Sequence, residues 1–129
     1  IKPNIIICLD SAYAKPDGAN NNKWIIPEIG KGPALQTIGK KFSMREKEIN
    51  FVKKVAKDNG LKLQYEIIDL KNGATNLSKF PNIKNKIQLN VPVKNQHTCF
   101  CECNLKDIEQ TSLLLTKVLE NICLNNKYK

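Results

Sequence analysis

Short apolar runs and alternating apolar and polar residues predict four β-strands in this chain. They cover residues 4–10, 33–38, 61–68 and 86–91. The first is a continuous apolar run, typical of a buried strand, and it ends in a carboxylate, Asp10. The third alternates apolar and polar side chains, as a half-buried strand does. We expect Pro92 to end the fourth, because proline cannot donate to a strand ladder.

Helical spacing of apolar residues predicts two helices. The first extends from Ser43 to Asn59, where Ser43 and Glu46 match the S-x-x-E capping box and Asn59 with the following glycine supplies a left-handed stop. The second starts after the capping residue Asn104 and reaches about Cys123. Its apolar positions include Leu105, Ile108, Leu115, Leu119 and Ile122.

The other segments contain the residues that favour turns. Residues 15–32 are predicted to form a long loop, and residues 69–85 to be loop-rich with one short helical turn. The order strand, strand, helix, strand, strand, helix predicts an α/β fold, a layered sheet with helices packed on it. The chain has 129 residues, 41% of them hydrophobic. It therefore fits one domain, residues 1–124, and we expect the tail at 125–129 to be disordered.

The chain is strongly basic, with a net charge of +9, but Arg45 is its only arginine. Specific recognition of bases and phosphates usually relies on the arginine fork, so we attribute the lysines to a compositional bias and rank nucleic-acid binding last. No apolar run approaches the ~20 residues that span a bilayer, so no membrane partner is expected. The five cysteines are an odd number without a secretion signal, which favours reduced thiols in the cytoplasm.

Asp10 and His97 are the first candidates for chemistry. Asp10 follows an apolar strand, and sites in α/β sheets form at the carboxyl ends of strands. His97, the only histidine, follows the fourth strand, so its loop should emerge beside the end of the first. Each has a structural alternative: Asp10 could cap the turn through Ser11, and His97 could be a structural residue that is not a metal ligand. Two ligands hold a catalytic metal poorly, because catalytic zinc usually has three protein ligands.

Three cysteines follow His97 in a C-x-C-x-C pattern. In an extended segment Cys99, Cys101 and Cys103 share one face, and with His97 they could form a thiolate-rich metal site. Zinc sites normally use C-x₂₋₄-C, so the spacing supports this alternative weakly. A cysteine–histidine nucleophile pair is also conceivable, although no motif supports it.

Six motifs follow one another in a specific order and spacing. ICLDSA stands where one known family has a strand ending in LDVT, IGKGPAL resembles its LGKGPAI-like segment, and VAKDNGLKLQYEI resembles its A-K-x-x-x-I-P-Y-Q-x-E stretch. NGATN stands where it has GGTD, NVPVKNQHT resembles VPxRYxHS, and NLKDIEQTSLLLTKVLENI resembles its closing helix. Together these segments resemble the C-terminal part of the glutamyl or deblocking aminopeptidases, the tetrahedral aminopeptidase family, some of whose members carry a cellulase or endoglucanase label.

The resemblance implies a zinc-peptidase-like α/β domain from an enzyme that removes N-terminal residues from peptides. In that family two divalent ions, commonly zinc or cobalt, activate the attacking water, and a glutamate is the general base. Asp10 and His97 match two of the family's metal ligands. Asn76 and Lys94 match positions that we assign to substrate binding. The family also implies a peptide substrate and self-association.

The family's other catalytic residues precede the matched segment and are not in this chain. They are a His-x-Asp pair, a bridging Asp and a Glu-Glu pair. We therefore expect no catalytic residue here, no activity of this chain alone, and weak metal binding or none. Asn76 replaces the Asp of GGTD, Lys94 and Asn95 replace the Arg and Tyr of VPxRYxHS, and Gly39 stands where many members have Asp. A degenerate, non-catalytic binding or self-assembly module is therefore a second hypothesis.

Overall fold

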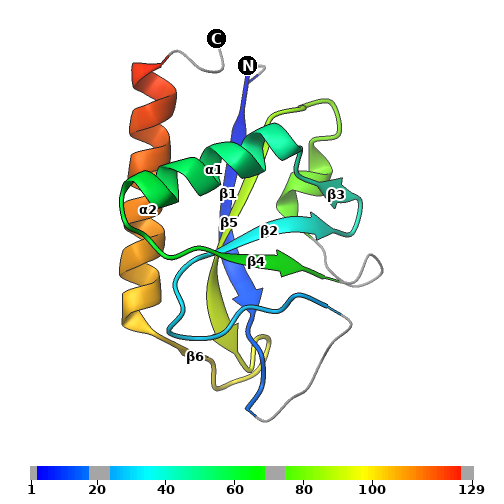
Figure 1. Cartoon of the computed structure of the whole chain (residues 1–129). Coiled ribbons are helices and arrows are strands. Elements are labelled where there is room, and N and C mark those ends of the chain that lie inside the picture. The colour runs from blue at the N-terminus through cyan, green and yellow to red at the C-terminus, as the bar shows by residue number, and fades with distance from the viewer. Residues whose placement is uncertain (1–2, 18–23, 69–74, 126–129) are drawn as a thin grey trace.

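The structure is a computed structural model that describes residues 3–17, 24–68 and 75–125 (Figure 1). Its elements are β1 (Ile6–Tyr13), β2 (Ala34–Gly39), β3 (Phe42–Ser43), α1 (Glu46–Asp58), β4 (Gln64–Ile67), the 3₁₀ helix η1 (Asn76–Lys79), β5 (Lys86–Lys94), β6 (Glu102–Cys103) and α2 (Leu105–Leu124). A mixed sheet with helices packed on it confirms the predicted α/β fold.

The sheet combines parallel and antiparallel pairing. β5 lies between its parallel partner β1 and its antiparallel partner β2, and β2 also pairs with β4 in parallel. In the β1–β5 ladder Asp10 lies opposite Asn90. Because β1 and β5 run in the same direction, their carboxyl ends meet at one end of the sheet, at the bottom of Figure 1. The loops that carry most of the candidate residues leave the sheet there.

Two strands extend further than their sequences predict. β1 continues three residues past Asp10 to Tyr13, so this aspartate lies within the strand. The prediction that Pro92 ends its strand is wrong, because β5 runs through it to Lys94. On one side of β5, β2 pairs only at Leu89 and Asn90, and β6 pairs only at Val93 and Lys94. Pro92 lies between these two ladders, where a missing N–H interrupts neither.

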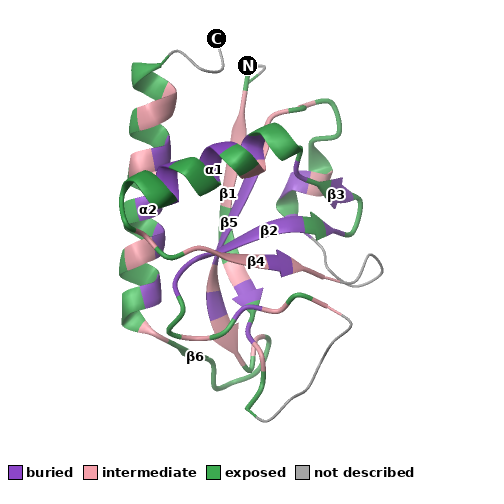
Figure 2. Ribbon diagram, in the orientation of Figure 1, coloured by how far each residue is buried: buried purple, intermediate pink, exposed green. Residues whose placement is uncertain are grey.

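The hydrophobic core lies between the sheet and the two helices. Figure 1 shows α1 crossing in front of the central strands and α2 running along the side of the sheet, and Figure 2 shows buried residues on the central strands and on the inner helix faces. The buried apolar cluster consists of Leu35, Phe42, Met44, Phe51, Val52, Val55, Ala56, Leu77, Ile87, Leu89, Leu114 and Val118. Each large aliphatic side chain buried there contributes about 1.5–3 kcal/mol of transfer free energy.

Helix α1 begins three residues later than its sequence predicts. The prediction of a capping box at Ser43 is wrong, because Ser43 pairs with Ile38 in the β2–β3 ladder, and Met44 N donates to Thr37 O at 2.8 Å. The chain thus stays extended up to Arg45, which occupies the N-cap without a side-chain capping bond. The predicted cap of α2 is confirmed, since Asn104 Oδ1 accepts from Lys106 N at 2.9 Å.

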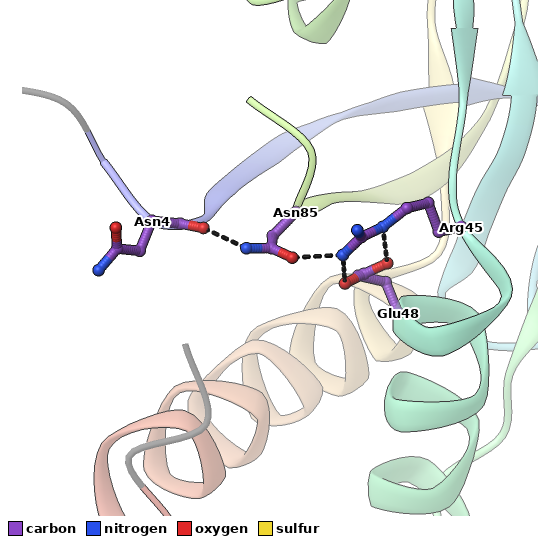
Figure 3. A network of polar contacts seen from close by, with 4 residues as sticks. All are labelled: Asn4, Arg45, Glu48 and Asn85. Atoms are coloured by element: carbon purple, nitrogen blue, oxygen red, sulfur yellow. Dashed lines mark hydrogen bonds and ion pairs between the residues drawn. The ribbon is translucent and has the colours of Figure 1, made fainter. Parts of the chain in front are cut away.

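A polar network fixes the start of α1 to the sheet (Figure 3). Arg45 makes two bonds to the fully buried Glu48, with Nε at 3.0 Å and Nη2 at 2.6 Å from the carboxylate oxygens. Arg45 Nη2 also donates to Asn85 Oδ1, and Asn85 Nδ2 donates to Asn4 O. These contacts connect the helix to the segments that lead into β5 and β1.

Helix α2 buries a different face from its most obvious apolar stripe. Its buried residues are Asp107, Thr111, Leu114 and Val118. Of the apolar positions that stand out in the sequence, Leu105, Ile108 and Leu119 are 74%, 42% and 44% exposed, and Leu115 and Ile122 pack at the edge of the core. An apolar stripe on α2 is therefore left facing outwards.

The predicted turn within 69–85 is present as η1, where Thr75 Oγ1 accepts from Leu77 N at 3.2 Å. Residues 69–74 lie outside the described residues. Asn125 caps the end of α2, and the rest of the expected tail, 126–129, is also outside them. In the part of the chain that the structure describes, no helix is both long and apolar enough to cross a bilayer.

Candidate functional site at the carboxyl ends of the parallel strands

Asp10 and His97 lie at the same end of the sheet on neighbouring segments. Asp10 is exposed on β1, and its Oδ1 accepts from Ser11 N at 2.8 Å. His97 is exposed in the loop that follows β5. The two segments touch, because Gln96 Nε2 donates to Ser11 O at 3.3 Å and also to Ser11 Oγ. The residues next to the two predicted ligands are thus in direct contact.

The loop that carries His97 turns sharply. Asn95 and His97 have φ angles of 52° and 65°, in the left-handed region that residues other than glycine seldom adopt. Thr98 closes the turn, with its N at 3.2 Å and its Oγ1 at 2.7 Å from Asn95 O. Backbone strain of this kind costs on the order of 1–3 kcal/mol per residue and concentrates at functional sites.

The donor set at this site suits a divalent ion but is incomplete. A carboxylate and an imidazole are both ligands of zinc and cobalt, and catalytic zinc usually has three protein ligands. Within the described ranges no group of three or more His, Cys, Asp or Glu side chains is arranged to hold a metal ion. Asp10 and His97 could therefore supply two ligands of a metal centre whose other ligands come from outside these residues.

The three cysteines after His97 are exposed and lie in different local structures. Cys99 lies in the bend after the turn, and Cys103 belongs to the short strand β6. Cys101 Sγ lies 3.4 Å from Asn95 O and 3.7 Å from Thr98 O, towards the inside of the loop. In the described structure these thiols form no cluster of three with one another or with His97.

Asn76 and Lys94, the candidate substrate-binding residues, lie on separate elements. Asn76 is the exposed first residue of η1, which packs against β1. Lys94 ends β5, and its Nζ lies 2.6 Å from Asp17 Oδ1. That hydrogen bond raises the pKa of Lys94 above its ordinary value and keeps the ammonium charged.

A chain of buried polar side chains, not predicted from the sequence, crosses the sheet next to Asp10. Thr75 Oγ1 donates to Gln88 Oε1 at 2.6 Å, Gln88 Nε2 to Asn90 Oδ1 at 2.7 Å, and Asn90 Nδ2 to Glu66 Oε2 at 2.7 Å. All four residues are at most 5% exposed. The sequence signal was present, because polar residues alternate with apolar ones along β4 and β5. Such alternation usually indicates a solvated face, so burial of this face could not be inferred.

Glu66 is the acceptor at the end of this chain. Burial raises its pKa from 4.5 to about 7, opposed by hydrogen bonds from Asn90 and from the backbone of Tyr13. The negative charge of Asp10 raises the pKa of Glu66 further. A carboxyl that titrates near neutral pH therefore lies close to one of the two predicted metal ligands.

Comparison with known proteins identifies the family. Residues 1–114 match the sequence model of the M42 glutamyl aminopeptidase family. The chain belongs to this family. Among curated proteins this M42 chain is similar to "Putative aminopeptidase FrvX" of Escherichia coli (strain K12), with 33% identity over 81 residues. That match covers 62% of the chain and 22% of FrvX. The family resemblance inferred from the motifs is thus confirmed.

Solved structures show the same fold. A TET aminopeptidase from the marine sediment archaeon Thaumarchaeota archaeon SCGC AB-539-E09 superposes with a TM-score of 0.81 at 21% identity, covering 90% of this chain and 33% of that one. The Pyrococcus horikoshii TET1 peptidase, described as assembling into a tetrahedron or a large octahedral shell, gives 0.71 at 24% identity, covering 91% and 33%. The M42 chain therefore spans about a third of the length of these structures.

Proposed function

We propose that this chain is the C-terminal part of the catalytic domain of an M42 metal-dependent aminopeptidase, and that it supplies Asp10 and His97 to a two-metal site. The contact between Gln96 and Ser11 carries the proposal, because it brings the neighbours of both ligands together. The remaining ligands and the general base lie in the preceding part of the domain. The chain alone is then inactive towards peptides.

The residues of this chain have limited roles in that chemistry. When bound, the two divalent ions would supply an activated water and polarise the peptide carbonyl. Asp10 would contribute a carboxylate oxygen and His97 an imidazole nitrogen. The Asn95–Thr98 turn fixes the backbone conformation of His97. All five cysteines are free thiols, which supports our placement of the protein in the cytoplasm.

The proposal is tested first in the coding sequence and then in the completed protein. The reading frame before Ile1 should encode a His-x-Asp pair, a bridging Asp and a Glu-Glu pair. The joined polypeptide should hydrolyse aminoacyl p-nitroanilides with added Zn²⁺ or Co²⁺, whereas this chain alone should not. Asp10→Asn or His97→Ala should each lower kcat/KM by more than about 100-fold, since even loss of outer partners of a metal ligand costs 10–100-fold.

Two controls make this result specific. Asp58→Asn makes the same chemical change at an exposed carboxylate at the end of α1, and it should leave activity unchanged. Replacing Cys99, Cys101 and Cys103 together by serine should leave the bound metal stoichiometric, and loss of the metal would favour the alternative thiolate site. A start codon directly before Ile1, with none of the upstream ligands encoded, would refute the proposal and favour a degenerate binding module.

We also propose that the protein self-associates through α2. This helix carries the outward stripe of Leu105, Ile108 and Leu119. Phe100, five residues before the start of the helix, is a further apolar side chain and is 84% exposed. Exposed apolar surface of this kind marks an interaction site. The P. horikoshii TET1 peptidase, which shares this fold, is described as forming large shells.

A further inference from the structure

The backbone of the loop from Glu28 to Gly32 is held from two sides. From β4, Gln64 Oε1 accepts from Glu28 N at 2.9 Å, and its Nε2 donates to Glu28 O at 3.0 Å and to Gly32 O at 2.8 Å. From α2, the buried Asp107 accepts from Gly30 N at 2.6 Å and from Gly32 N at 2.8 Å. Only main-chain atoms of the loop take part in these bonds. Its side chains therefore stay available for other contacts.

Close packing at Gly32 adds to this fixation. Its φ is +94°, and a Cβ there would meet Gln110 Oε1 and Lys62 Cβ, each at 2.9 Å. The loop thus packs directly against Gln110 of α2 and against Lys62, which lies just before β4. A loop held in this way presents its side chains at fixed positions, which lowers the entropy cost of binding a ligand.

An ion pair lies close to this loop. Lys94 Nζ lies 2.6 Å from Asp17 Oδ1, and the Lys94 side chain is 20% exposed whereas that of Asp17 is 92% exposed. These two charges neutralise each other. Lys94 is also tied to the sheet as the last residue of β5.

A polar pocket of about 230 Å³ lies between the loop and this ion pair. It is lined by Lys15, Pro16, Asp17, Glu28, Ile29 and Lys94. Within the described part of the chain, the Lys15 ammonium and the Glu28 carboxylate make no side-chain hydrogen bond or ion pair. The volume is below the roughly 300–1,000 Å³ of typical small-molecule sites, so the pocket has room only for a small molecule. One positive and one negative charge thus remain uncommitted around a small space.

We propose that this pocket binds a small zwitterion, an amino acid or a dipeptide, with Glu28 contacting its ammonium and Lys15 its carboxylate. The pocket lies where β1 and β5 end, at the same end of the sheet as Asp10 and His97. The assignment of the ligand as a substrate or product rests on the proposed aminopeptidase function, but the charge complementarity does not. Glu28 and Lys15 are the specificity residues, and Asp107 and Gln64 are positioning residues.

Ligand binding to the chain itself tests this proposal without any metal. Amide chemical shifts would be followed by NMR during titration with glycine, glycylglycine, ethylamine and acetate. Both zwitterions should cause saturable shifts at residues 14–17, 28–32 and 94, and the tighter one identifies whether an amino acid or a dipeptide is preferred. Glu28→Gln and Lys15→Met should each weaken zwitterion binding by about tenfold or more, since charge-assisted bonds contribute about that much.

Matched substitutions outside the pocket separate this effect from general charge. Glu109→Gln and Lys106→Met change exposed residues of α2 and should leave the Kd unchanged. Absence of saturable shifts with both zwitterions would overturn the proposal, and so would equal weakening by the pocket and control variants. Asp107→Asn should weaken binding while the shifts of residues in α1 stay native-like. Because no metal is needed, a negative result here leaves the aminopeptidase proposal standing, and an inactive completed enzyme leaves this binding site standing.

Discussion

At the scale of single residues, burial separates polar side chains that lie close together in the sheet. Glu66 is 2% exposed and accepts a hydrogen bond from Asn90, whereas Asp10, opposite Asn90 on β1, is exposed. Asn90 is thus between a buried carboxyl and a solvated one. The buried carboxyl carries the cost of desolvation, so its charge state is coupled to folding.

Glu66 should make the protein less stable as the pH rises from about 4.5 to about 7. Its pKa in the folded protein is about 7, above the ordinary 4.5, so the folded state binds more protons than the unfolded state in this range. The linked loss in the free energy of unfolding is about 3 kcal/mol. Glu66→Gln removes this ionisation. Urea unfolding at several pH values should show the variant gaining that amount relative to the wild type across the range.

The matched control for this measurement is Glu109→Gln, an exposed carboxyl on α2. This control should not reproduce the pH-dependent gain expected for Glu66→Gln. Parallel pH profiles for Glu66→Gln and the wild type would mean that Glu66 does not titrate with a raised pKa.

At the scale of elements, polar contacts between side chains and backbone decide where the helices start and how they attach. α1 has no side-chain cap, and the Arg45–Glu48 pair anchors its first turn to Asn85. α2 does have a cap, and its buried Asp107 reaches out to the loop at Gly30. Both helices are thus tied to loops by a buried carboxylate in the first turn, which also suits the positive end of a helix.

Arg45→Met should destabilise the protein by about 3–5 kcal/mol, because it leaves the buried Glu48 carboxylate without its cation. Replacing both residues, Arg45→Met with Glu48→Met, should recover much of that loss, since no uncompensated charge remains. Lys54→Met on the same helix breaks the exposed pair with Asp58 and should cost less than about 1 kcal/mol. Urea unfolding monitored by circular dichroism measures all three. Equal losses in the free energy of unfolding for Arg45→Met and Lys54→Met would contradict the claim that the buried Glu48 carboxylate depends on Arg45.

At the scale of the whole molecule, the chain has surfaces that its own residues do not cover. It spans about a third of the length of the solved relatives. Among the described strands β1 pairs only with β5, so its other edge has no partner there. Leu9 and Tyr13 on this strand are 52% and 45% exposed. Exposed strand edges and apolar side chains favour association with another polypeptide.

We expect the isolated chain to self-associate as its concentration rises, as sedimentation velocity would show. Ile108→Lys together with Leu119→Lys should shift the protein towards monomer, because a buried contact cannot accept two unpaired ammonium groups. Leu113→Lys alters an equally exposed leucine of α2 outside the stripe and should leave association unchanged. A wild-type protein that remains monomeric at all concentrations would contradict this prediction.

Much of the fold follows from local patterns in the sequence. Apolar periodicity located four strands and both helices, and Asn104 was recognised as a cap because an N-cap bond spans only two residues. The errors occurred where a distant segment competes with a local signal. Ser43 pairs with β2, so it cannot cap α1. Pro92 fits within β5 because neither β2 nor β6 pairs with the strand at that position. No local pattern contains that information.

For the candidate site, the sequence by itself determined the family, because the ordered motifs are a property of the chain, and it predicted the pair Asp10 and His97 as metal ligands. Tertiary structure alone decided that Gln96 contacts Ser11 and that Glu66 is buried beside the site. It also decided which face of α2 is covered and that Lys15 and Glu28 border one pocket. Each of these features depends on which side chains another segment of the chain buries. Burial changes the pKa of a side chain and decides whether that side chain can contact a ligand.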